Sequence, residues 1–142
     1  MNSELNPEGE EKLNHSSELD FNGRNILLVE DSDMNQMIAC EILNDAGFIV
    51  DVCGNGLEAI EAVQKKSYEV VLMDIQMPLM GGFEATTNIR ALGDDYVELP
   101  IIAMTGHVEI ADKEKFLFSD HIIKPFYPDE LLLILSKWII HN

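Results

Sequence analysis

Five polar side chains with complementary chemistry stand where apolar runs of the sequence end. Glu30 and Asp31 directly follow one run, and Asp74, Thr105 and Lys124 each close another. A buried ionised carboxylate is costly unless a cation or hydrogen-bond donors compensate for its lost hydration. Asp74 therefore needs either an escape to solvent at the end of its run or a partner elsewhere in the chain.

The chemistry of this set depends on how close its members come. Three carboxylates in one place repel one another and raise their pKa values unless a cation binds. A hard divalent ion such as Mg2+ fits oxygen ligands and commonly keeps several waters and a phosphate oxygen. An ammonium group such as that of Lys124 suits a phosphoryl oxygen or the Asp74 carboxylate, and Thr105 can donate one hydrogen bond. The residue types predict a magnesium site.

The elements that would position these residues alternate along the chain. Short apolar segments predict strands, and apolar residues at helical spacing predict helices between them. The expected strands are 25–29, 49–53, 70–74, 100–105 and 121–124, and the expected helices are 34–47, 56–66, 82–92, 109–118 and 128–140. Strands separated by helices imply right-handed crossovers and a parallel sheet, and nearly continuous apolar strands fit burial on both faces. The predicted fold is an α/β, three-layer, doubly wound sheet of five strands.

Such a sheet explains why distant residues would meet. The carboxyl ends of parallel strands lie along one edge, where ligands bind. The acids, the hydroxyl and the ammonium of the five-residue set all fall at that edge, whereas the second strand contributes no comparable group. A simpler alternative makes Asp31 or Asp33 only a cap for the first helix, which we expect to begin at Asp33 as N-cap and to end at Gly47.

Length and composition limit the organisation of the chain. With 142 residues, 46% of them apolar, the chain can bury one core and is expected to form one domain. Residues 1–22 are acidic and poor in large apolar groups, which predicts a flexible tail or linker before a folded domain at 23–142. A short helix from Glu8 to Leu13 is the alternative within that tail.

Charge, cysteine content and hydropathy disfavour several functions. The net charge of −17 makes direct nucleic-acid binding improbable, since that binding depends on clustered Lys and Arg. Cys40 and Cys53 lack the spacing of a zinc site or disulfide framework and are read as ordinary thiols. No apolar run reaches the length of a membrane span, and the start of the chain lacks a signal-peptide pattern. We expect a cytoplasmic protein without membrane association.

Four short motifs at successive strand ends resemble the receiver domain of two-component response regulators. They are "VED" at 29–31, "LMDIQMP" at 72–78, "MT" at 104–105 and "KP" at 124–125. The resemblance covers about residues 24–141, and the phrase "MDIQMPLMGGFEAT" is most similar to receivers attached to hybrid sensor histidine kinases. It implies the flavodoxin-like strand order 2-1-3-4-5.

The resemblance also implies a role for each site residue. Asp74 would accept a phosphoryl group from a phosphohistidine on a sensor histidine kinase or a histidine phosphotransfer protein. Asp31 and Asp74 would bind Mg2+ directly, Glu30 would bind it through water, and the backbone carbonyl of Gln76 would be a further ligand. Such a site acts by positioning and charge neutralisation, and the chain would be a signalling module that catalyses only its own phosphotransfer and dephosphorylation.

Two residues would convert phosphorylation into a change of surface. Thr105 and Lys124 would be drawn toward the phosphoryl oxygens. His121 occupies the position where the family often has a switching aromatic residue, and it is either a switch residue or a plain surface residue. The bond between Lys124 and Pro125 resembles one that is cis in the family.

Other functions remain as alternatives. A pseudo-receiver would bind partners without being phosphorylated. A hydrolase of the haloacid-dehalogenase type is disfavoured because position 76 is Gln where an acid would be needed, and a flavodoxin-like cofactor binder is disfavoured because the loop "VEDSD" would repel phosphate. The row "LLLIL" at 131–135 suits either a homodimer interface or close packing. The chain is either free-standing or a module of a hybrid kinase.

Overall fold

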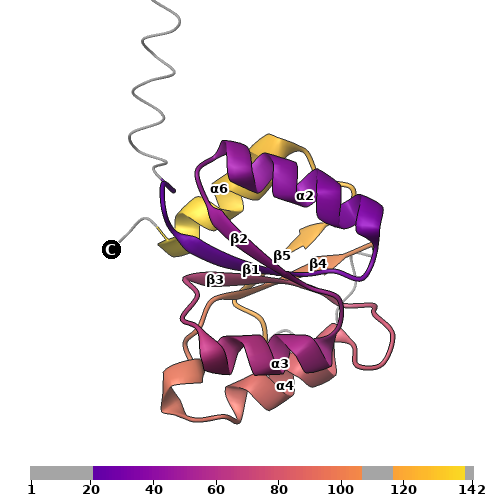
Figure 1. Ribbon diagram of the computed structural model, residues 1–142, viewed down its shortest axis with the longest axis vertical. Coiled ribbons are helices and arrows are strands. Elements are labelled where there is room, and N and C mark those ends of the chain that lie inside the picture. The colour runs from indigo at the N-terminus through magenta and orange to yellow at the C-terminus, as the bar shows by residue number, and fades with distance from the viewer. Residues whose placement is uncertain (1–20, 107–116, 140–142) are drawn as a thin grey trace, which may run out of the picture.

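The computed structural model describes residues 21–106 and 117–139, which form a three-layer α/β fold (Figure 1). Five parallel strands pair in the order β2-β1-β3-β4-β5, which confirms the predicted topology. The strands are β1 (Asn25–Val29), β2 (Ile49–Cys53), β3 (Val70–Asp74), β4 (Ile101–Thr105) and β5 (Asp120–Ile123). The described helices are α2 (Asp33–Asp45), α3 (Gly56–Lys65), α4 (Gly82–Arg90) and α6 (Pro128–Ile139), with a 3-10 turn, η1, at Asp94–Tyr96.

The two faces of the sheet are covered by different helices. Figure 1 shows α2 and α6 on one side of the sheet and α3 and α4 on the other. Alternate residues of one strand point to opposite sides, so Leu28 and Leu72 join the core beneath α2 and α6, whereas Leu27 and Val71 join the core above α3 and α4. This burial on both faces is why the central strands are apolar along nearly their whole length.

Helix α2 begins with a different cap from the one expected. Ser32 is the N-cap, because its side-chain oxygen accepts a hydrogen bond from the backbone N–H of Asn35 at 3.2 Å. Asp33 is the first helical residue, so its assignment as N-cap was wrong. The Ser32 hydroxyl, one residue earlier than expected, accepts from an N–H group of the first turn. The negative charge of Asp33 lies near the positive end of the helix dipole, which is favourable.

Helix α2 ends two residues before Gly47, the residue at which the sequence predicted its end. The helix stops at Asp45, and Gly47 follows with a φ of 104°, a conformation that glycine adopts at no steric cost. The expected helix at 109–118 lies mostly in residues 107–116, outside the described part of the chain. Its last two positions, Leu117 and Phe118, are not helical.

The packed domain includes two residues that the sequence placed in the tail. The ring of Phe21 stacks on that of Phe48 with a centroid separation of 4.6 Å, and Phe21 is only 1% exposed. Asn22 lies against Gly47, and the N–H of Gly23 donates to the Gly47 carbonyl at 2.9 Å. Residues 1–20, including the alternative short helix, lie outside the described residues.

Arg90 fastens the segment that leads into β5. Its half-buried guanidinium donates hydrogen bonds to the carbonyls of Tyr96, Leu99 and Leu117 at 2.6–3.1 Å. These contacts join the end of α4 to the starts of β4 and β5, whose other ends carry site residues.

In the part of the chain that is described, no helix is long and apolar enough to cross a bilayer.

Candidate functional site

Three carboxylates meet at the carboxyl edge of the sheet. Glu30 and Asp31 follow β1, Asp74 ends β3, and β1 and β3 are paired neighbours. One oxygen from each carboxylate lies within 4.8 Å of the others. Glu30 and Asp74 are only 2% and 4% exposed, whereas Asp31 is exposed. The cluster therefore has a buried floor and one side open to solvent.

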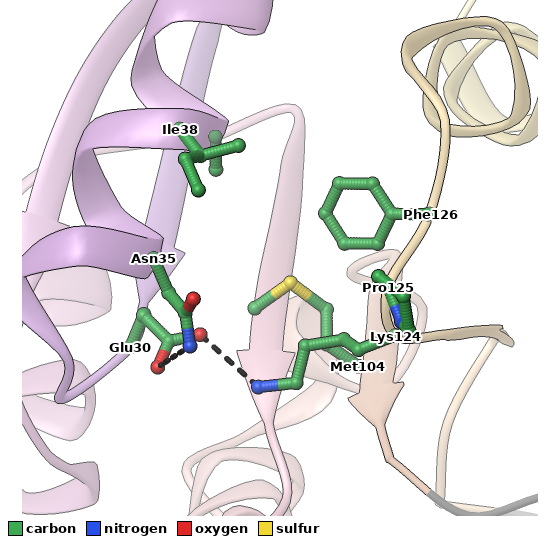
Figure 2. Close-up of a pocket in the computed structure, with 8 residues that line it drawn as sticks. Glu30, Asn35, Ile38, Met104, Lys124, Pro125 and Phe126 are labelled. Carbon is green, nitrogen blue, oxygen red and sulfur yellow. Dashed lines mark hydrogen bonds and ion pairs between the residues drawn. The ribbon is translucent and has the colours of Figure 1, made fainter.

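Within the described part of the chain, Lys124 brings a positive charge to this cluster. Its Nζ lies 3.3 Å from Glu30 Oε1 and 3.4 Å from Asp74 Oδ1, so one ammonium bridges two buried acids. Figure 2 shows the side chain reaching from the end of β5 toward Glu30 on the opposite side of the pocket. The side chains of Glu30, Asp74 and Lys124, which are far apart in the sequence, therefore lie close together in the structure, as the sequence predicted.

The remaining contacts of Glu30 come from the first turn of α2. The backbone N–H of Ser32 donates to Glu30 Oε2 at 3.2 Å, and the Asn35 amide approaches the same oxygen at 3.5 Å. The Gln36 amide donates to the main-chain carbonyl of Glu30 at 2.6 Å. Both the carboxylate and the backbone of Glu30 are therefore held from the same helix end.

The electrostatic balance at Asp74 is unfavourable for its charged form. The pKa of Asp74 is raised to about 6, first by burial and then by the neighbouring Glu30 charge. Lys124 and a hydrogen bond from the Gln76 backbone N–H, at 3.3 Å from Asp74 Oδ1, oppose that rise without cancelling it. Among the residues that the structure describes, one ammonium faces three carboxylates, which is too little positive charge to balance them.

The donor set fits a hard divalent cation. Its ligands are carboxylate oxygens, and Mg2+ binds such oxygens through a few protein ligands while keeping water in its other positions. The exposed side of Asp31 leaves room for those waters. The backbone N–H of Gln76 lies beside the Asp74 carboxylate, so the Gln76 main chain is near the cluster, and the role of its carbonyl as a ligand stays a prediction.

The other two predicted residues lie in different surroundings. Thr105 is 6% exposed at the end of β4, and the backbone N–H of Lys124 donates to its carbonyl at 2.7 Å. His121 lies in β5 opposite Ala103, and its side chain is exposed. The structure thus brings Thr105 to the same edge as the acids and leaves His121 farther back along β5. The bond between Lys124 and Pro125 is cis, as the resemblance implied.

A hollow beside the cluster was not expected from the sequence. It encloses about 250 Å³ and is lined by Glu30, Asn35, Ile38, Ala39, Met104, Lys124, Pro125 and Phe126. Figure 2 shows Ile38, Met104 and Phe126 forming its apolar part next to the Glu30–Lys124 pair. Asn35 and Gln36 were also missed. Their side chains reach back over the turn from Glu30 to Ser32, and the only sequence signal for this is their place in the first turn of a helix that follows an acidic strand end.

Two solved structures resemble this fold along nearly their whole length. The receiver domain of sensor histidine kinase PA1611 from Pseudomonas aeruginosa PAO1 is 35% identical with a TM-score of 0.76, covering 84% of this chain and 99% of that chain. A magnesium ion is coordinated in its active-site cleft. Response regulator TrrA of Thermotoga maritima, in complex with Mg2+ and BeF, is 27% identical with a TM-score of 0.75 over 82% of this chain and 99% of that one.

A curated relative carries a similar segment inside a much longer protein. Hybrid signal transduction histidine kinase B of Dictyostelium discoideum is 42% identical over 125 residues, which are 79% of this chain and 6% of that kinase. The chain thus spans a small part of the length of this relative. The sequence model of the protein family described as the response regulator receiver domain matches residues 26–136 of this chain. The chain therefore belongs to the receiver domain family of two-component signalling systems.

Proposed function

We propose that this chain is a phospho-accepting signalling switch in which Asp74 takes a phosphoryl group from a phosphohistidine. The observation that carries the proposal is the position of Asp74 at the end of β3, buried among two further carboxylates and 3.4 Å from Lys124 Nζ. A buried acid with an incompletely compensated charge is suited to bind a cation and a phosphoryl group rather than to stabilise the fold.

The acceptor step requires little chemistry from the protein. A carboxylate oxygen of Asp74 forms a bond to phosphorus while the bond between phosphorus and the imidazole nitrogen breaks, and the electron pair of that bond stays on the nitrogen. Mg2+, when bound, would neutralise charge on the phosphoryl oxygens. Asp31 and Asp74 would hold it directly, Glu30 through water, and Gln76 through its carbonyl. The chain orients the acceptor and excludes bulk water from it.

Lys124 and Thr105 would couple phosphorylation of Asp74 to a change in the surface of the protein. Lys124 bridges two acids at 3.3 and 3.4 Å, so a new anion on Asp74 competes directly for its ammonium. Thr105 ends the neighbouring strand and offers a hydroxyl to the same group. Movement of both shifts the population toward an active surface. Because His121 is exposed on β5, a switching role requires its side chain to turn toward Thr105.

The partner that delivers the phosphoryl group must carry a histidine on a surface that fits the rim of the site. Three apolar side chains of α2 beside the acidic cluster are unusually exposed: Met34 and Met37 at 68% and Ile38 at 51%. An apolar surface of this kind suits packing against a helix, and flexible methionines adapt to different partners. We infer a sensor histidine kinase or a histidine phosphotransfer protein as that partner.

A homodimer interface would involve an exposed leucine of α6. Leu133 of α6 is 62% exposed, whereas Leu131 and Leu135 on the same helix are fully buried. The row at 131–135 therefore packs mainly into the core and leaves one leucine outside. Analytical ultracentrifugation of the protein and of its Leu133→Ser variant would decide this: a dimer lost in the variant supports the interface, and a monomeric wild type contradicts it.

Exposure to acetyl phosphate with and without Mg2+, followed by intact-mass measurement, tests the proposed function. We expect the wild type to gain the mass of one phosphoryl group only with Mg2+, and Asp74→Asn to gain none. Asp33→Asn is the matched control, because Asp33 is an exposed acid in the first turn of α2 outside the three-carboxylate cluster. Equal uptake by the wild type and Asp74→Asn would contradict the assignment. A folded wild type that takes up no phosphate would favour the pseudo-receiver, which binds partners without modification.

A further inference from the structure

Gln36 closes the turn between β1 and α2 with two hydrogen bonds. Its side-chain amide donates to the main-chain carbonyl of Glu30 at 2.6 Å, and its backbone N–H donates to the carbonyl of Ser32 at 2.8 Å. One residue of the helix therefore contacts both the first and the last residue of the turn that carries Glu30 and Asp31. The helix itself does not require the contact between the Gln36 side chain and Glu30, because the backbone N–H of Gln36 already makes the hydrogen bond of the first helical turn.

The backbone of Glu30 is consequently held on two sides. Its N–H donates to the carbonyl of Cys53 in β2 at 3.0 Å, and its carbonyl accepts from Gln36. The carboxylate is divided between helix and lysine, with Oε2 accepting from Ser32 N–H and Oε1 facing Lys124 at 3.3 Å. Lys124 pulls the carboxylate toward the far side of the pocket, so the backbone contacts resist a shift of the whole residue.

Cation affinity depends on such supporting contacts because ligand atoms must be held near their bound positions before the ion arrives. Glu30 and Asp31 are consecutive, so a shift of the Glu30 carbonyl also rotates the peptide that leads to Asp31. We propose that Gln36 is a positioning residue that sets the Mg2+ affinity of the site through the main chain of Glu30. This inference rests on the proposed function, which includes the Mg2+ site.

A matched pair of variants separates positioning from general loss of a hydrogen bond. Gln36→Met keeps an unbranched side chain of similar length but removes the donor. Gln64→Met makes the same change in α3, a helix that supplies no residue to the three-carboxylate cluster, where the exposed Gln64 amide donates to the carbonyl of Ile60 at 3.0 Å. Mg2+ dissociation constants are measured by NMR titration with MgCl2, and melting temperatures are measured in EDTA.

We expect Gln36→Met to raise the Mg2+ dissociation constant about tenfold, the lower end of the range seen when a contact that supports a metal ligand is removed. Gln64→Met should bind Mg2+ within about twofold of the wild type, because Gln64 is uncharged and its amide contacts Ile60 rather than a residue that holds a metal ligand. If Gln36→Met does not fold, Gln36→Asn replaces it: this variant keeps an amide that is one methylene too short, and it should weaken Mg2+ binding in the same direction.

Each result has a separate meaning. A Gln36 variant that binds Mg2+ as tightly as the wild type overturns the inference, even if its melting temperature in EDTA is lower, because Gln36 would then be only structural. Equal weakening in the Gln36 and Gln64 variants overturns it as well. A wild type that binds no Mg2+ contradicts the proposed function itself.

Discussion

Asp74 is placed where its charge is only partly compensated. It is nearly inaccessible to solvent, it lies beside Glu30, and it shares the Lys124 ammonium with that acid. Burial and the Glu30 charge together outweigh Lys124, and the pKa of Asp74 rises from 3.8 to about 6. Burial and the Glu30 charge disfavour the free carboxylate of Asp74 and favour a bound cation. The raised pKa of Asp74 therefore fits a binding role.

This shift predicts how the stability of the metal-free protein depends on pH. Because the pKa of Asp74 is raised in the folded state, the folded protein keeps a proton that the unfolded chain has already lost, and stability falls as pH rises through the folded pKa of about 6. Between about pH 5 and pH 7, we expect the unfolding free energy in EDTA to fall by about 1 kcal/mol through this residue.

Urea unfolding in EDTA across that pH range measures the effect. Asp74→Asn cannot titrate, so its stability should vary less with pH than that of the wild type, and the difference between the two curves isolates Asp74. Parallel curves for the two proteins would mean that the Asp74 pKa is not raised in the folded state.

Individual site residues were predictable to different degrees. Glu30, Asp74 and Lys124 could be located from the sequence because each stands at the end of an apolar run, and parallel strands place those ends together. Gln36 could not be located, because its contact depends on the path of a three-residue turn and on the rotamer of a long side chain. The exposure of His121 likewise depends on its place in an edge strand.

At the scale of elements, the end of β3 is fixed by a close backbone approach. The N–H of Gly82, the first residue of α4, donates to the carbonyl of Ile75 at 2.9 Å. A Cβ on Gly82 would lie 2.5 Å from the Asp74 carbonyl and 2.9 Å from Ile75 Cα. These are backbone atoms that cannot rotate away, so α4 can approach the acceptor strand this closely only with glycine at this position.

Gly82→Ala is therefore expected to destabilise the protein by about 1–3 kcal/mol, the usual cost of forcing extra volume into a packed site. The displaced Asp74 backbone should also weaken Mg2+ binding. Gly54→Ala is the matched control, since the nearest atom to its new Cβ would be Glu58 Oε1 at 3.8 Å. Thermal unfolding and Mg2+ titration of both variants check the prediction, and equal stability of the two variants would refute it.

The elements themselves were largely predictable. β2 and β3 have the expected bounds, and β1 does as well, because short apolar runs between helical patterns leave little choice of register. Helix ends were less predictable. Ser32 and Asp33 are both good N-caps, and only the backbone conformation shows that Ser32 bonds the N–H of Asn35.

At the scale of the whole molecule, we propose that the folded domain begins at Phe21. The ring of Phe21 belongs to the core beneath α2 and α6 and stacks on Phe48, which follows α2. A single aromatic residue in an acidic, polar segment gives no periodic signal, so its burial could not be inferred from the sequence. The change in composition predicted a domain boundary between residues 22 and 23. The packing contacts of Phe21 instead support a boundary before Phe21.

Two truncations test this boundary. A chain that begins at Phe21 should melt at the same temperature as the full chain, whereas one that begins at Gly23 should be less stable by about 3 kcal/mol, as expected for deleting a buried phenylalanine. Phe21→Ala in the full chain should match the shorter truncated form. Identical melting temperatures for the two truncations would place Phe21 outside the stable domain.

The whole fold serves to bring acids from separate strands together in a chain whose net charge is already −17. Binding of a cation to the folded state alone must raise stability by mass action. At a Mg2+ concentration ten times the dissociation constant, the gain is about 1.4 kcal/mol, which corresponds to a rise of roughly 5 °C in melting temperature for a domain of this size.

Melting temperature as a function of Mg2+, with NaCl at matched ionic strength as the control, is thus the most direct test of the central claim. Our account predicts a saturable rise for the wild type and for Asp33→Asn, and a much smaller rise for Asp31→Asn and Asp74→Asn. A rise no larger than that with NaCl, or an equal rise in all four proteins, would contradict the claim that these carboxylates form one cation site.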